Sequence, residues 1–115
     1  MSQQAIPVLA LTALLTGTVT ANRFVTPAGA QAGADANTLG VVRTAGVSGE
    51  KVTADVLGTA IVEAGAAVAA NATVKSDASG RAITWVSSGA KVGIALQAAS
   101  AAGDLIEVLL IPNAA

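Results

Sequence analysis

Apolar and polar positions alternate in short runs along most of this chain. From residue 39 onward, runs rich in β-branched residues are separated by clusters of Gly, Asn, Asp and Ser, at intervals of about 8 to 12 residues that are typical of a β-sandwich or β-barrel. The clearest run covers residues 51–57, whose side chains follow the two-residue period of a strand. Its apolar face carries Val52, Ala54 and Val56, and its polar face carries Lys51, Thr53 and Asp55. The pattern predicts an all-β domain, a small barrel or sandwich, over residues 38–115.

Two further runs extend this β pattern. Residues 81–87 alternate in the same way, and residues 77–80 before them have the Asp and Gly of a tight turn. Residues 105–111 are apolar on both faces except at Glu107, which indicates a strand buried on both sides. Pro112 is expected to end that strand, because proline cannot donate to the ladder.

Two alanine-rich segments, residues 64–72 and 97–102, raise the question of helices, because alanine has the highest helix propensity. Gly65 interrupts the first segment and Gly103 ends the second. Isolated helices shorter than about 12 residues are marginal in water. We therefore expect at most one or two helical turns, which leaves the fold class all-β.

The N-terminal part, residues 1–37, has no clear period and is predicted to be an extended arm and a long loop, with proline and glycine at intervals over residues 27–33. Its apolar run, residues 5–20, lacks the preceding positive charge of a secretory signal peptide, since the first basic residue is Arg23. The run is also shorter and richer in Thr and Gly than a membrane span, which needs about 20 apolar residues. An arm or strand is therefore expected, and no membrane association.

Composition suggests a thin core. The chain is 53% hydrophobic but only 2% aromatic, so its apolar content comes from small and medium side chains that each bury little area. Burial stabilises by about 25 cal/mol per Å² of apolar surface, and small domains offset the loss of chain entropy only narrowly. We therefore expect several subunits to associate and to bury apolar surface against one another.

Charge argues against a nucleic-acid partner. The net charge is -1 at pH 7 and the six basic residues are scattered singly, whereas a phosphate backbone requires a stripe of Lys and Arg. There is no cysteine, so neither a disulfide framework nor a thiolate metal site can form.

The residue types also argue against catalysis. The chain contains no His, Cys or Tyr, which are common general bases, nucleophiles and metal ligands. Residues 88–91 match an S-x-x-K pattern, but we interpret them as a turn because the S-D-N and K-T-G elements of serine acyltransferases are missing. Neither glycine-rich phosphate motif occurs, and the carboxylates lack the density of a calcium loop. The sequence predicts no enzymatic activity, no cofactor and no metal site.

Trp85 and Phe24 are the aromatic residues of the chain. A lone Trp in a predicted strand more often fills the core than binds a ligand, so we assign Trp85 to the core. Phe24 follows Arg23 in the arm region. Large apolar and Arg side chains often dominate interfaces, so both residues are candidate contacts.

Three blocks of sequence, taken in order, carry a resemblance to a known family. They are EAGAAV at residues 63–68, VKSDASGRA at 74–82 and GIALQAASAAGDLIEVLL at 93–110. This part of the chain resembles the small capsid cement, or decoration, proteins of tailed phages. The resemblance implies a small β-barrel-like body, often trimeric, seated on the capsid exterior where major capsid proteins meet, with an arm that helps to grip the lattice. It implies no catalytic motif.

These observations favour a structural virion protein that is made in the bacterial cytoplasm and cements neighbouring major capsid proteins on the outer capsid surface. The charge-free start of the chain fits a strand that adds to an exposed sheet edge, and a closed homotrimer matches a site that repeats around a lattice axis. The candidate capsid-contact residues are Ile6, Val8, Leu9, Leu11, Arg23 and Phe24.

Two alternatives remain at this point. One is another virion part, such as the base of a head fibre. The other is a secreted or surface carbohydrate-binding β module, for which the apolar start would be a cleaved signal. Such modules are expected to carry aromatic platforms, and two aromatic residues in the whole chain make this alternative poor.

Overall fold

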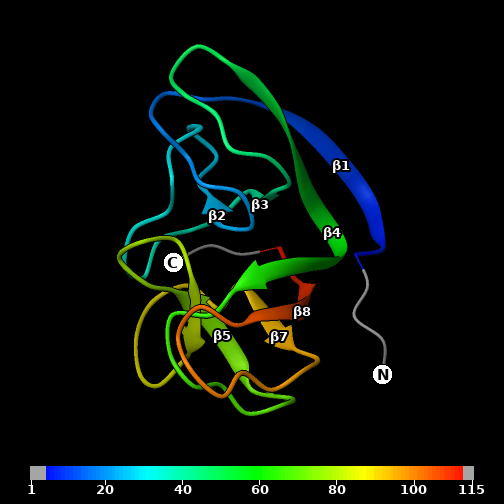
Figure 1. The fold of residues 1–115 in the computed structure, drawn as a ribbon, viewed down its shortest axis with the longest axis vertical. Coiled ribbons are helices and arrows are strands. Elements are labelled where there is room, and N and C mark those ends of the chain that lie inside the picture. The colour runs from blue at the N-terminus through cyan, green and yellow to red at the C-terminus, as the bar shows by residue number, and fades with distance from the viewer. Residues whose placement is uncertain (1–4, 113–115) are drawn as a thin grey trace.

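A computed structural model describes residues 5–112 as eight antiparallel strands with no helix among them (Figure 1). The strands are β1 (Pro7–Leu14), β2 (Phe24–Val25), β3 (Gly40–Val42), β4 (Lys51–Glu63), β5 (Thr73–Ser76), β6 (Ala82–Thr84), β7 (Gly93–Ala95) and β8 (Leu105–Leu110). They form one sheet in the order β2-β3-β4-β8-β7-β5-β6, and β1 pairs with β4. The sheet curls toward a barrel, which confirms the predicted all-β class.

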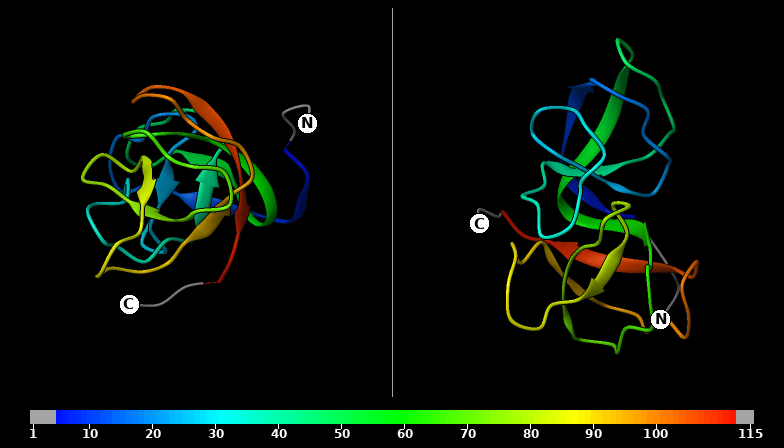
Figure 2. Two further views of the ribbon diagram at one scale, coloured as in Figure 1. Left: turned by 90° about the horizontal axis from the view of Figure 1, so that it is seen from below. Right: turned by 90° about the vertical axis from the view of Figure 1, so that its left-hand side faces the viewer.

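The long strand β4 organises the molecule. Its first half pairs with β1 and β3, and its second half pairs with β8. The strand bends between these halves (Figure 1), near Gly58, which is opposite both Pro7 and Leu110 and has a φ of 95°. Two lobes result, stacked along the long axis (Figure 2): an N-terminal lobe of β1, β2, β3 and residues 51–57, and a C-terminal lobe of residues 58–63 and β5 to β8.

Two hydrophobic clusters lie on opposite faces of β2 and β3. Phe24 and Val41 belong to the larger cluster, which fills the C-terminal lobe, whereas Val25 and Val42 belong to the smaller one, which fills the N-terminal lobe. Successive side chains of a strand point to opposite faces, so these two short strands supply both clusters. The smaller cluster is completed by Ala13, Leu15, Val19 and Ala54.

Much of the predicted strand pattern is confirmed. The strand expected at residues 51–57 is present and continues to Glu63. The expectation that β8 is buried on both sides holds only in part: Ile106, Val108 and Leu110 are buried on one face, whereas on the other face Glu107 is buried but Leu105 and Leu109 are exposed. The turn at residues 77–80 also forms: Asp77 Oδ1 accepts hydrogen bonds from the main-chain N–H groups of residues 79 and 81 at 2.8 and 2.9 Å.

The alanine-rich segments are loops of bends and turns joined by an isolated β-bridge, and neither is helical. The main chains of Val68 and Ala99, one from each segment, exchange two hydrogen bonds at 3.0 and 2.8 Å, and both side chains are buried in the larger cluster. Pairing over a long range in sequence satisfies the backbone here, so local helix propensity does not decide the structure.

The assignment of Trp85 to the core is wrong. Strand β6 ends at Thr84, and the half-buried Trp85 belongs to neither cluster. Its indole N–H donates to the carbonyl oxygen of Gly89 at 3.0 Å, and the ammonium of Lys91 lies 4.4 Å from the ring centroid. The indole therefore contacts and stabilises the loop that follows β6.

The predicted arm is partly built into the body. Pro7–Leu14 form β1, whereas Leu15, Val19 and Ala32 are core residues. The expected boundary at residue 37 stays a prediction, and residues 1–4 of the expected arm lie outside the described residues. Within residues 5–112, no helix could span a membrane.

Candidate interaction surface

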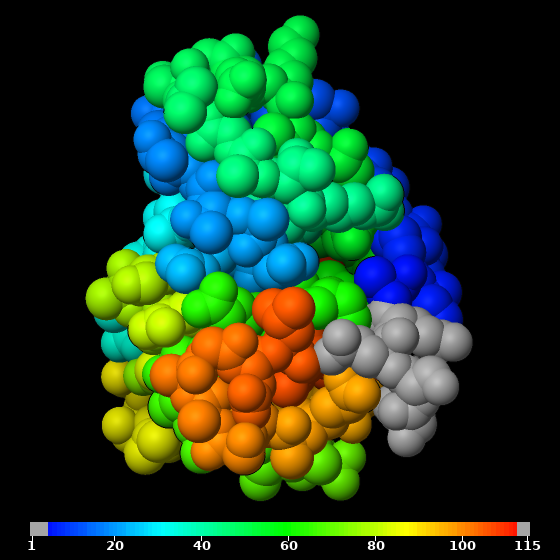
Figure 3. Space-filling view, viewed as in Figure 1, coloured from blue at the N-terminus to red at the C-terminus, as the bar shows by residue number. Residues whose placement is uncertain are grey.

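Strand β1 exposes apolar side chains on both of its faces. Five large apolar side chains from this segment are exposed, with fractions of 80% for Val8, 56% for Ile6, 55% for Leu14 and 41% each for Leu9 and Leu11. The strand lies on the outside of the N-terminal lobe, where its atoms form a continuous strip of surface (Figure 3). Contiguous exposed apolar surface usually marks an interaction site, so β1 is the candidate surface.

Both ends of β1 are fixed to the body. At its start, Ile6 and Thr59 exchange hydrogen bonds: Ile6 N–H donates to Thr59 Oγ1 at 2.8 Å and Thr59 N–H donates to the Ile6 carbonyl at 3.0 Å. At its end, Ala13 is buried and Leu15 follows in the smaller cluster. The exposed side chains between these two ends therefore lie on a strand that is fixed to the body at both ends.

The surface carries no charge of its own, because no charged residue precedes Arg23. One carboxylate, Asp55, lies opposite Ala10 on β4, but its side chain is only 3% exposed. The guanidinium of Arg43 pairs with it, and Nε donates to Oδ1 at 2.7 Å. An apolar partner that covers β1 would therefore not meet an unpaired carboxylate at Asp55.

Four of the six predicted contact residues, Ile6, Val8, Leu9 and Leu11, come together on this surface. Leu14 also belongs to it and was missed in the sequence analysis. The signal was present, since Leu14 continues the apolar run; its exposure follows from its register opposite the exposed Lys51, which the sequence alone does not give.

The side chain of Arg23 makes its contacts within the protein. Its guanidinium lies 3.3 Å from a carboxylate oxygen of Glu63 and donates to the carbonyl oxygen of Ser79 at 3.1 Å. Arg81 reaches the same carboxylate at 3.6 Å. This network ties the start of β2 to the end of β4 and to the β5–β6 turn, away from β1.

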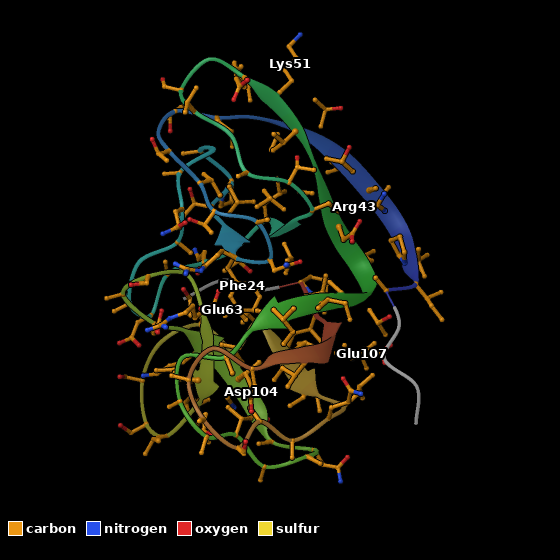
Figure 4. The ribbon with its side chains drawn as sticks, viewed as in Figure 1. Phe24, Arg43, Lys51, Glu63, Asp104 and Glu107 are labelled. Atoms are coloured by element: carbon orange, nitrogen blue, oxygen red, sulfur yellow. The ribbon has the colours of Figure 1, made fainter. Side chains whose placement is uncertain are left out.

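The expectation that Phe24 contacts a partner has to be revised. Its side chain is 0% exposed and belongs to the larger cluster, and Figure 4 shows it at the junction of the lobes, away from β1. Its N–H donates to the Gly80 carbonyl at 2.8 Å, so contacts distant in sequence bury it. A side chain without exposed surface offers nothing to a partner.

Residues 5–112 contain no pocket and no group of three carboxylates that could hold a metal ion. The Ser and Lys of the S-x-x-K sequence make separate contacts: Ser88 Oγ lies 3.3 Å from the Asp35 carboxylate, and Lys91 lies over Trp85.

The contact between Lys75 and Asp35 should be detectable in the titration of the Asp35 carboxyl. Lys75 Nζ lies 2.7 Å from Asp35 Oδ1, and this hydrogen bond lowers the pKa of Asp35 below its ordinary value. A carboxyl whose pKa falls on folding stabilises the protein above its unfolded pKa, and that contribution is lost as the pH falls through the folded value.

We therefore expect Lys75→Met to raise the pKa of Asp35 toward its ordinary value, as measured by NMR titration of the side-chain carboxyl carbon. Asp104 is the internal control: its pKa is lowered by hydrogen bonds from the hydroxyl and main-chain N–H of Ser100, and these do not involve Lys75. An unchanged titration of Asp35 in the variant would contradict the assigned cause.

Comparison with known proteins identifies the family. The family of phage cement proteins matches residues 2–110, and the search of curated proteins gives no match. Among solved structures, the N base of the head fibre protein gp8.5 of bacteriophage phi29 shares the fold, with a TM-score of 0.71 and 18% sequence identity over 90% of this chain and 93% of that one. Since the family match spans nearly the whole sequence, this chain belongs to the phage cement protein family and is a structural protein of the phage virion.

Proposed function

We propose that this protein binds the exterior of the phage capsid through β1 and cements neighbouring major capsid proteins. The observation that carries the proposal is the uncharged strand β1, apolar and exposed on both faces, in a member of the phage cement family. Binding that covers these side chains removes apolar surface from water, which is the main favourable term in most protein associations. No chemical step is needed for this role.

A homotrimer is part of the same proposal. The clusters are built almost entirely from Ala, Val, Leu and Ile, so a single copy has little apolar area with which to offset its loss of chain entropy. A closed ring of three copies would match a capsid site with threefold symmetry. Three linked contacts would also bind more tightly than one, because the second and third form at high effective concentration.

A head fibre base is the second candidate function, favoured by the shared fold with the phi29 protein. Both candidates attach to the capsid, but only a cement must stabilise it. We expect capsids saturated with the protein to withstand heating better than bare capsids, as measured by release of their DNA. Saturated capsids that open at the same temperature as bare ones would favour the fibre base.

The contact itself can be tested with a matched pair of exposed valines. Val8 on β1 is 80% exposed and Val86, in the loop after β6, is 75% exposed. Substitution of either by Glu should leave the core intact. We expect Val8→Glu to weaken binding to undecorated capsids by about tenfold or more, because an unpaired charge in an apolar contact costs more than the 1.4 kcal/mol that a factor of ten represents.

Capsid occupancy would be measured by co-sedimentation and by imaging of capsids mixed with each purified protein. Val86→Glu is expected to bind within about twofold of the wild type, since isolated surface substitutions usually change free energies by less than about 0.5 kcal/mol. Equal binding of Val8→Glu and the wild type would exclude β1 as the contact.

A further inference from the structure

Strand β1 has one edge paired with β4, in a register that is regular from Ala10 to Leu14 and shifted between Pro7 and Ala10, and a second edge that can be traced over the regular part. Thr12 lies opposite Thr53, and Leu15 N–H donates to the Glu50 carbonyl at 2.8 Å. Residues along an antiparallel pair alternate between those that exchange hydrogen bonds and those that do not. Counting back from Leu15, Ala13 and Leu11 bond to β4, whereas Thr12 and Ala10 direct their N–H and C=O groups away from it.

Strand β3 confirms this alternation from the other side of β4. Arg43 N–H donates to the Thr53 carbonyl at 3.2 Å, so Thr53 uses its main chain toward β3 and not toward Thr12. The carbonyl of Asp55, which lies opposite Ala10, likewise points at Gly40 of β3. No hydrogen bond to the outward main-chain groups of Ala10 or Thr12 is present among residues 5–112.

This open edge has defined limits. At its start, Pro7 has no N–H to donate. At its end, the turn containing Gly29 covers the strand: Gly29 lies against the Leu14 carbonyl, and its own carbonyl accepts a hydrogen bond from Thr16 N–H at 3.0 Å. The edge that remains open covers residues 8–13, and its outward N–H and C=O groups are fixed by regular pairing from Ala10 onward, which is enough for a short added strand.

The other strands at the ends of the sheet are protected. Strand β2 has two residues, and the Gly80 carbonyl accepts the N–H of Phe24. Strand β6 has three residues, and Gly65 N–H donates to the Ala82 carbonyl at 2.8 Å. Proteins usually protect edge strands by shortness, charge or cover. Strand β1 has eight residues and no charge; Pro7, the irregular register between Pro7 and Ala10, and the Gly29 turn protect only its two ends, so the edge between them is open.

We infer that the open edge of β1 binds an extended, uncharged, apolar segment of the major capsid protein as an added β-strand opposite residues 8–13. This inference rests on the proposed capsid binding and specifies how it is made. Main-chain hydrogen bonds from Ala10 and Thr12 would hold the segment. Its side chains would lie beside Val8, Leu9 and Leu11, where an unpaired charge would be desolvated at a cost, so the segment is uncharged.

The test removes a single outward N–H. Thr12→Pro deletes the donor on the open edge but none of the bonds between β1 and β4, and proline is tolerated on an edge strand whose N–H faces solvent. Thr12→Val is the matched control, because it keeps the N–H and replaces the hydroxyl by a methyl group. We expect Thr12→Pro to lower the affinity for undecorated capsids at least tenfold and Thr12→Val to bind like the wild type.

The outcomes separate this inference from the proposal on which it rests. Normal capsid binding by Thr12→Pro together with loss of binding by Val8→Glu would overturn strand addition but leave β1 as the contact. Failure of the wild type to bind capsids would overturn both. A dimer of the free wild type that Thr12→Pro converts to monomer would assign the edge to a second copy of this chain, and would also overturn the inference.

Hydrogen exchange gives a second measurement that does not depend on a variant. In the free protein, the amides of Ala10 and Thr12 should exchange rapidly, whereas those of Leu11 and Ala13 should be protected by β4. On capsids, Ala10 and Thr12 should become protected as well. Continued rapid exchange of both amides in the bound protein would overturn the inference even if Thr12→Pro unfolded.

Discussion

Replacement of Phe24 by Ala is expected to destabilise the protein by about 3 to 5 kcal/mol, the usual cost of removing a buried phenyl ring. The side chain is fully buried in the larger cluster, most of whose other members are Ala and Val, so little can move in to fill the cavity. Small domains have only about 5 to 15 kcal/mol of stability in total. The variant should therefore be close to unfolding, as measured by urea denaturation.

Two further substitutions separate a core role for Phe24 from a contact role. Val86→Ala, at an exposed position, should change the stability by less than about 0.5 kcal/mol. Phe24→Leu should keep the fold at reduced stability and bind capsids like the wild type. Loss of capsid binding by folded Phe24→Leu would restore this residue as a contact and contradict the burial seen here.

Replacement of Gly58 by Ala is expected to have the second large effect, because two penalties coincide. The residue has a φ of 95°, a conformation that costs an L-residue about 1 to 3 kcal/mol. A Cβ atom there would also collide with the Ile6 carbonyl oxygen and lie 2.7 Å from the main-chain nitrogen of Val8. The start of β1 would have to move, so we expect a total loss above about 3 kcal/mol.

Two other glycines allow these penalties to be measured apart. Gly103 has the same φ of 95° but nothing within 4 Å of an added Cβ, whereas Gly17 has neither a positive φ nor a close neighbour. Urea denaturation should place Gly103→Ala between the other two, with Gly17→Ala unchanged or slightly stabilised. Hydrogen exchange should show faster exchange in β1 for Gly58→Ala alone. If Gly58→Ala matched Gly103→Ala in both measurements, the collision with β1 would be excluded.

The sequence predicted those parts of the fold that depend on local pattern. The alternation at residues 51–57, the strand around Glu107 and the Asp77 turn each carry their signal within a few residues, and each element is present in the structure. The burial of both faces of the strand around Glu107 was overestimated, because Leu105 and Leu109 are exposed. The family resemblance also rested on contiguous blocks, and the family match confirms it.

The errors concern residues whose environment is set by distant parts of the chain. Phe24 is buried because β2 pairs with β3 and meets Gly80, far along the sequence. Trp85 lies outside both clusters although its main-chain N–H still donates to the Thr73 carbonyl at 2.9 Å. Ala82 is the residue of β6 in the larger cluster, and Ile83 and Trp85 fall on the alternate positions. The apolar run of the candidate surface is visible in the sequence. Its exposure depends on the fact that β1 pairs with β4 along one edge and with no described strand along the other. Local hydrophobicity alone does not distinguish a buried strand from an exposed one.

The division of β2 and β3 between two clusters restricts how this protein can evolve. Phe24 and Val25 face opposite lobes, as do Val41 and Val42. An insertion or deletion of one residue within either pair would turn the side chains that follow it to the opposite face of the strand. Side chains of different size would then be exchanged between the two lobes at once. Length changes are therefore expected to be purged from these two strands among related chains and to accumulate in loops such as residues 43–50 and 86–89.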